Sequence, residues 1–143
     1  MVMSEKEDYG NSGKFSEADF KAMAPYCRER KLAKDEMLFK EGEPGKTMYF
    51  VTAGEVKVVK MGFNGEAVIT RVHPGEIVGE MAVIDGINRS ASVRASVATE
   101  LLEMDNASFV RLKKENPQVA LKLMELLLWM LTSRLRITTS LVL

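Results

Sequence analysis

The chain has 143 residues, of which 46% are hydrophobic and 28% charged, the composition of one ordinary globular domain. Twenty basic side chains balance 20 acidic ones, so no net charge draws it to nucleic acid or an anionic membrane. A single cysteine and a single histidine exclude a disulfide framework and most metal centres of the Cys and His types.

The amino-terminal region predicts a short helix after a flexible start. Residues 1–14 are polar and poor in large apolar side chains, and we expect them to be flexible. Their order of charges does not resemble a secretion signal, which favours a cytoplasmic protein. Ser16 can cap a helix, with Asp19 three residues on and Phe15 positioned to pack on Phe20. We expect residues 15–35 to be the helical part, with Pro25 limiting the first helix to about two turns.

Residues 36–104 predict an antiparallel β unit, because short apolar runs alternate there with glycine-containing turns. One predicted hairpin pairs residues 48–52 with 56–60 across Ala53-Gly54. A second pairs residues 56–63 with 67–72 across Asn64-Gly65, the strongest short hairpin signal. Seven or eight such strands indicate a sandwich or a jelly-roll barrel.

Residues 105–143 predict two helices, the first capped by Asp105 or Asn106 and the second opened by Asn116-Pro117. The last helix is apolar on several sides, and its charged residues break the run too often for a membrane span. A homodimer that buries the apolar sides of this helix is the simplest arrangement, and a monomer with an exposed apolar tail is the alternative. One stripe consists of Ala120, Leu123, Leu127, Met130, Arg134, Ile137 and Leu141. A neighbouring stripe consists of Leu121, Met124, Leu128, Leu131, Leu135, Thr138 and Val142, and Leu126 and Trp129 add a third side.

The stretch 75–93 interrupts the β pattern and carries the chemistry. Residues 80–84 can form one helical turn, whose free N–H groups and positive dipole end attract a phosphate. Gly79 lacks a Cβ that would keep a ligand from the backbone, and Arg89 can grip a phosphate with two hydrogen bonds. The N–H groups of Ser90 and Ala91 could complete this anion cradle. Glu80 repels phosphate and should instead accept from a ribose hydroxyl, so the set describes a ribose phosphate.

The same stretch closely resembles the phosphate-binding cassette of cyclic nucleotide-binding domains, the family of the catabolite activator and protein kinase A regulatory subunits. Gly79-Glu80-Met81-Ala82 and residues 89–93 match best, and the resemblance spans roughly residues 15–143 as one domain. It implies a mainly β fold with flanking helices, built on an eight-stranded jelly-roll β-barrel (double-stranded β-helix). It also implies a sensor that binds cAMP or cGMP without catalysis, signals by moving its last helix, and needs no further cofactor or metal.

The resemblance assigns roles residue by residue. Glu80 would bind the ribose 2′-OH and Arg89 would bind the cyclic phosphate. Ser90 favours cAMP over cGMP as the ligand. The full set of expected ligand-binding residues is Val78, Gly79, Glu80, Met81, Ala82, Arg89, Ser90, Ala91, Thr138 and Thr139, the last two reaching the purine. No helix-turn-helix follows, so we expect no nucleic acid partner for this chain by itself, and the output partner is open.

Other functions fit less well. Glu80 and Arg89 could be a plain surface ion pair. The domain could be a dimerising interaction module with a degenerate pocket or another anionic effector, or the effector part of a transcription regulator. A metal-dependent jelly-roll enzyme is disfavoured by the single histidine, and Gly45-Lys46-Thr47 lacks the rest of a P-loop.

Overall fold

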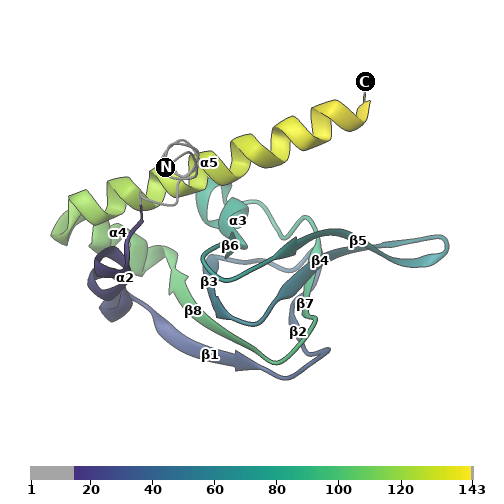
Figure 1. The fold of residues 1–143 in the computed structure, drawn as a ribbon, viewed down its shortest axis with the longest axis horizontal. Helices are drawn as coiled ribbons and strands as arrows, with labels where there is room; N and C mark the ends of the chain where they lie inside the picture. The colour runs from purple at the N-terminus through teal and green to yellow at the C-terminus, as the bar shows by residue number, and fades with distance from the viewer. Residues whose placement is uncertain (1–14, 143) are drawn as a thin grey trace, which may run out of the picture. The chain divides into compact units, whose positions relative to one another are not determined.

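The computed structural model describes residues 15–142, with side chains described as far as Ile137. Contacts divide the chain into two compact units (Figure 1). One is Cys27–Ser108, here called the β unit. The other combines residues 15–26 with residues 109–142 and is called the helical unit.

The β unit consists of two four-stranded antiparallel sheets, in the orders β1-β8-β3-β6 and β2-β7-β4-β5 (Figure 1). Eight strands and the jelly-roll fold are confirmed, but a closed barrel is wrong: no backbone ladder joins the two sheets within the described residues. Apolar side chains from both sheets, such as Val51, Val56 and Leu101, form the core between them. The elements are β1 (Arg28–Leu32), β2 (Met37–Phe39), β3 (Thr47–Ala53), β4 (Val56–Gly62), β5 (Gly65–Val72), β6 (Ile77–Val78), α3 (Glu80–Asp85), β7 (Ser92–Ala95) and β8 (Thr99–Asp105).

One of the two predicted hairpins forms. β4 pairs with β5 as predicted, but Gly62 lies opposite Gly65, so the turn consists of Phe63 and Asn64 and not of the expected Asn64-Gly65. The predicted pairing of β3 with β4 is wrong, because these strands belong to different sheets and the chain crosses between them at Gly54. Gly54 adopts a left-handed φ of +88°, and a side chain there would collide with Ala98 and Thr99. The tight turn therefore passes the chain to the second sheet instead of returning it along the first.

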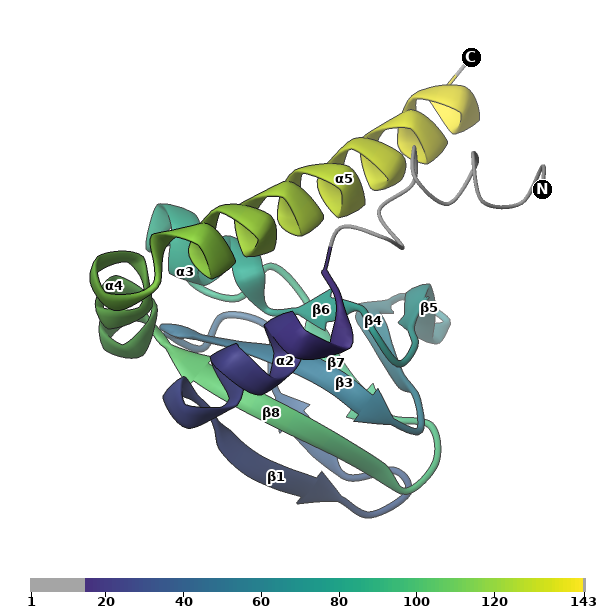
Figure 2. The same cartoon turned by 60° about the vertical axis from the view of Figure 1, so that its left-hand side comes forward.

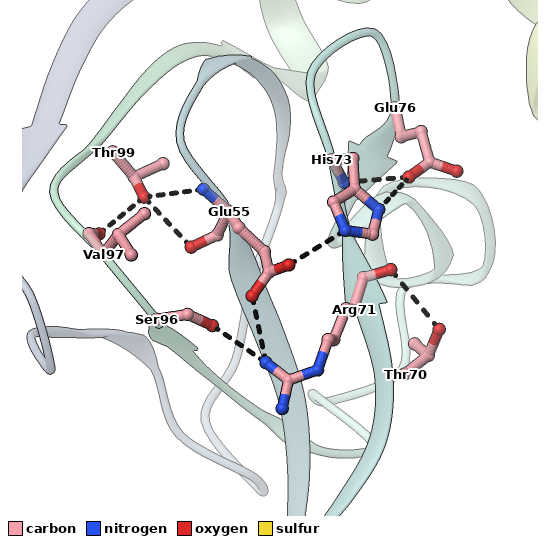
Figure 3. Close-up of polar contacts among 8 residues, drawn as sticks. All are labelled: Glu55, Thr70, Arg71, His73, Glu76, Ser96, Val97 and Thr99. Carbon is pink, nitrogen blue, oxygen red and sulfur yellow. Dashed lines mark hydrogen bonds and ion pairs between the residues drawn. The ribbon is translucent and has the colours of Figure 1, made fainter.

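Buried Thr99 holds this crossing in place (Figure 3). Its hydroxyl accepts a hydrogen bond from the N–H of Glu55 at 3.2 Å and lies 2.8 Å from the carbonyl oxygen of Val97. The Glu55 carboxylate pairs with Arg71 and His73, both at 2.9 Å. The backbone of Glu55 is thus satisfied by Thr99 at the start of β8 and by the N–H of Ser96 just after β7.

Residues 28–32 form strand β1 and not part of the predicted helical segment over residues 15–35. The strand lies at a sheet edge beside β8, and its basic residues sit opposite acidic ones, with Arg28 facing Glu103 and Lys31 facing Glu100. Cross-strand pairs of opposite charge stabilise such a ladder. Because the partners are about 70 positions away, the run itself carries no β signal.

The helical unit contains α2 (Glu17–Met23), the 3-10 turn η1 (Ala24–Tyr26), the end of α4 (Asn106–Glu115) and α5 (Pro117–Val142) (Figure 2). The predicted amino-terminal cap is confirmed, since Ser16 and Asp19 form a reciprocal capping box. The Phe15 and Phe20 rings meet edge to face with centroids 4.9 Å apart. The starts of both carboxy-terminal helices are also confirmed, with Asp105 and Asn116 accepting from Ser108 and Val119. Within the described part of the chain, no helix is long and apolar enough to cross a membrane.

Candidate functional site

Arg89 is the centre of the candidate site, and its backbone is fixed first. The residue lies in the connection between α3 and β7, and only 6% of it is exposed. Its N–H donates to the carbonyl of Glu43 at 2.9 Å, and its own carbonyl accepts from Gly42 at 2.8 Å. These two bonds join the cassette connection to the loop between β2 and β3. The loop therefore sets where the arginine side chain starts.

The guanidinium of Arg89 is held on several sides. Nη1 donates to the carbonyl oxygen of Gly79 at 2.8 Å, and Nη2 donates to that of Thr47 at 2.9 Å. The Cζ atom lies 4.0 Å from the centroid of the Phe39 ring, the distance of a cation–π contact. The Nε atom is buried and has no hydrogen-bond partner. A buried donor without a partner on a charged group requires an explanation, and an acceptor that binds there is one.

The electrostatics of this site are those of a buried positive charge near two carboxylates. Burial lowers the pKa of Arg89, and the carboxylates of Glu43 and Glu80 oppose part of that shift. The guanidinium stays protonated at neutral pH all the same, because arginine is not deprotonated in proteins. The two carbonyl oxygens that it contacts carry only partial charge. A buried positive charge in these surroundings gains most from a fully charged acceptor such as a phosphate.

Gly79 and Glu80 begin the short helix α3 beside this arginine. Gly79 caps the helix with a left-handed φ of +82°, which glycine adopts without strain. A Cβ there would lie 2.9 Å from Arg89 Nη1 and 3.2 Å from both Phe39 and the carbonyl of Thr47. The space that a side chain would occupy at Gly79 is thus bordered by Arg89, Phe39 and Thr47. Glu80, the first helical residue, is only 2% exposed although it is charged.

The remaining predicted site residues are placed unevenly. Val78, Ala82 and Ala91 are buried, whereas Met81 and Ser90 are exposed. Within the described residues, the N–H groups of Ser90 and Ala91 make no hydrogen bond to protein. Thr138 and Thr139 belong to α5, but their side chains lie outside what the structure describes. The structure therefore brings together Gly79, Glu80 and Arg89, and it leaves the purine contacts untested.

Three residues of the site were missed by the sequence analysis as site residues: Phe39, Gly45 and Thr47. Phe39 ends β2 and Thr47 begins β3, so both border the loop that holds the Arg89 backbone. No charge or motif marks them, because one acts through its ring and the other through a main-chain oxygen. Their distance from Arg89 along the chain is more than 40 positions. Only the pairing of the loops brings them to the guanidinium.

No group of three or more His, Cys, Asp or Glu side chains in the described residues is placed to hold a metal ion. The chemistry that the site offers is recognition of charge and of a hydroxyl. It consists of one buried guanidinium, one buried carboxylate and the backbone N–H groups around them.

Comparison with known proteins identifies the family. The profile of the cyclic nucleotide-binding domain matches residues 29–116, more than half of the chain. The chain belongs to the cyclic nucleotide-binding domain family. The match contains the whole Arg89 site, so the domain's defining segment and the geometry above coincide.

The similar proteins found by comparison are longer than this chain. It is 33% identical over 103 residues to the cyclic AMP receptor protein of Thermus thermophilus, covering 71% of this chain and 48% of that protein. It is 34% identical over 94 residues to a putative potassium channel protein of Rhodopseudomonas palustris, covering 66% of this chain and 23% of the other. The chain thus spans between about a quarter and a half of these relatives.

A solved structure supports the fold of the domain directly. A cyclic nucleotide-binding domain from Methylobacillus flagellatus superimposes with a TM-score of 0.77 at 33% sequence identity. The superposition covers 85% of this chain and 69% of that one. The likeness extends over more of the chain than the family profile matches, so it includes part of the helical unit.

Proposed function

We propose that this domain is a non-catalytic sensor that binds a cyclic nucleotide, with cAMP preferred to cGMP. The observation that carries the proposal is the buried Arg89 guanidinium, whose Nε lacks a partner while its other nitrogens are anchored. Arginine binds phosphate through two parallel hydrogen bonds, and each charge-assisted bond contributes about 1.5–3 kcal/mol. The cyclic phosphate would take Nε together with a neighbouring N–H.

The rest of a cyclic nucleotide would use the groups beside Arg89. The backbone N–H groups of Ser90 and Ala91 would donate to the phosphate oxygens. Glu80, a buried carboxylate, would accept from the ribose 2′-OH, the role that an acidic side chain has in dinucleotide sites. Met81, Val78 and the purine contacts of Thr138 and Thr139 stay in the proposal as expected ligand-binding residues. The pairing of a guanidinium with a hydroxyl acceptor favours a ribose phosphate over a bare anion.

The preference for cAMP has two modest supports. Ser90 occupies the position where the family resemblance associates threonine with cGMP. The Thermus relative is named a cyclic AMP receptor protein. The alternative is a domain of the same fold whose pocket takes a different anionic effector, and titration with both nucleotides separates the two.

Signalling would reach the carboxy-terminal helices through the start of β3. Thr47 receives the Arg89 guanidinium, and the preceding residue, Lys46, accepts a hydrogen bond from the N–H of Asn106 at 2.8 Å. Asn106 is the first residue of α4, which continues into the helical unit. A phosphate that binds the same guanidinium would therefore affect a segment that is hydrogen-bonded to the first residue of α4. Such a signal requires different nucleotide affinities for two positions of the helices.

The carboxy-terminal helix would also form a homodimer. Leu121, Leu128 and Leu135 recur every seven residues on α5 and are 58%, 64% and 66% exposed. Met124 and Leu131 fall between them, completing the spacing of a two-stranded coiled coil. The opposite side of the helix is already buried through Leu123, Leu126, Leu127 and Met130. The heptad stripe thus remains for a second copy of the chain.

Removing the guanidinium tests the nucleotide site. Arg89→Ala should reduce cAMP affinity by at least about 2 kcal/mol, roughly thirtyfold, through the loss of charge-assisted bonds. Isothermal titration calorimetry measures it for cAMP and cGMP. Arg71→Ala is the matched control. Arg71 contacts Glu55, which lies just beyond the end of β3 opposite to Thr47. The length of β3 separates the two ends by about 20 Å. Equal affinities of wild type and Arg89→Ala would contradict the proposal.

The role of Glu80 is tested by pairing a variant with a modified ligand. Glu80→Gln keeps the shape of the side chain but removes its charge, so cAMP affinity should fall about tenfold. Cyclic 2′-deoxy-AMP lacks the hydroxyl, and its affinity should not respond to the variant. A double-mutant cycle by calorimetry gives the coupling between carboxylate and hydroxyl. An equal loss with both ligands would show that Glu80 does not bind the ribose.

The proposed dimer is tested by placing a charge in its stripe. Leu128→Glu should convert a dimer into a monomer, because a coiled-coil seam does not accept buried like charges. Sedimentation velocity on the full chain measures the change. Val110→Glu, at an exposed apolar position of α4, should leave the dimer intact. A monomeric wild-type chain at all concentrations would refute the dimer.

A further inference from the structure

The Arg89 guanidinium lies in a slot made by four residues, three of which are more than 40 positions from it in the chain. Phe39 covers it with its ring, and Thr47 and Gly79 accept hydrogen bonds from its two Nη atoms. Gly45 is the fourth member. A Cβ at Gly45 would overlap Nε, Cζ and Nη2 of Arg89, so the glycine backbone is packed directly on the guanidinium. These residues, Phe39, Gly45, Thr47 and Gly79, are called the arginine slot below.

Gly45 differs from the left-handed glycines of the loops in the reason why a side chain is excluded there. Its φ is not left-handed, so the backbone there accepts an alanine. The collision with Arg89 is thus the reason for a residue without a side chain at this position. By contrast Gly79 is required both by its positive φ and by its neighbours. An alanine at Gly45 therefore reports on the guanidinium alone.

The contacts also restrict how a ligand can approach. Arginine has five N–H donors in one plane, and the two carbonyls take one from each Nη. Phe39 covers a face of that plane, and Gly45 closes space next to Nε and Nη2. Under the proposed function, the phosphate would bind in the plane of the guanidinium at the unused Nε–H. A side chain held in this way loses little further conformational freedom when the ligand binds.

We propose that Phe39 and Gly45 are positioning residues that set the affinity for the phosphate by fixing the Arg89 guanidinium, without themselves touching the ligand. The inference rests on the proposed function, because it concerns the arginine that would bind the cyclic phosphate. Phe39 acts by cation–π attraction, which an aliphatic side chain of similar size does not supply. Gly45 acts by leaving the space that the guanidinium occupies.

Two pairs of variants test the slot in the full-length chain. Gly45→Ala is compared with Gly62→Ala, which also lacks a left-handed φ and has no neighbour nearer than 3.6 Å. Phe39→Leu is compared with Phe39→Tyr, which restores an aromatic face. Calorimetry with cAMP should show losses of about tenfold for Gly45→Ala and Phe39→Leu, and changes within about twofold for the two controls. Urea unfolding of every variant separates this effect from loss of the fold.

An NMR measurement tests the contacts of the arginine slot in the absence of nucleotide. The Nε–H resonance of Arg89, assigned by its disappearance in Arg89→Lys, is shifted by the Phe39 ring in a 1H–15N spectrum. It should move in Phe39→Leu and in Gly45→Ala and keep its place in Phe39→Tyr and Gly62→Ala. An unmoved resonance in the first two variants overturns the slot, whether or not nucleotide binds.

The outcomes distinguish the two proposals. If wild type binds cAMP and the first two variants bind it equally well, the slot is refuted and the nucleotide function stands. If wild type binds neither cAMP nor cGMP, the proposed function fails, and the Nε–H resonance still decides whether Phe39 and Gly45 fix the guanidinium. Reduced affinity with a displaced resonance and an unchanged unfolding midpoint supports both.

Discussion

The arrangement of this domain depends on how one positive charge is accommodated inside a β fold. Removing a guanidinium from water is costly unless its donors are satisfied and its charge is compensated. Arg89 meets part of that demand with the carbonyls of Thr47 and Gly79 and the ring of Phe39. The donor that remains unsatisfied, Nε, is the one to which the proposed function assigns the phosphate. The unsatisfied Nε is therefore both a cost to the folded state and the group that is proposed to bind the ligand.

That constraint explains features that are otherwise unrelated. The left-handed Gly79, the missing side chain of Gly45 and the backbone bonds of Arg89 to Gly42 and Glu43 all converge on one side chain. The same region carries the link from Lys46 to the first residue of α4. Because Lys46 and Thr47 are adjacent in the chain, the guanidinium and the start of α4 are hydrogen-bonded to neighbouring carbonyl groups. The β unit thus contains the site and the first step of its proposed output.

Sequence reasoning succeeded where the determining contacts are local. The Ser16 capping box and the β4–β5 hairpin each depend on residues within a few positions, and Gly79, Glu80 and Arg89 lie within one short stretch. It failed where distant contacts decide. The turn at Gly54 resembles a hairpin locally, but Thr99 directs the chain into the other sheet. Strand β1 is charged and becomes a strand only through its acidic partners on β8. Phe39, Gly45 and Thr47 were missed as site residues for the same reason, since they meet Arg89 only in the folded sheets.

The most direct test of this account is a crystal structure of the protein with cAMP. The account predicts a phosphate oxygen within hydrogen-bond distance of Arg89 Nε, with the guanidinium still over Phe39. A nucleotide bound elsewhere, or an Arg89 side chain turned to solvent with its phosphate held by other groups, would contradict it.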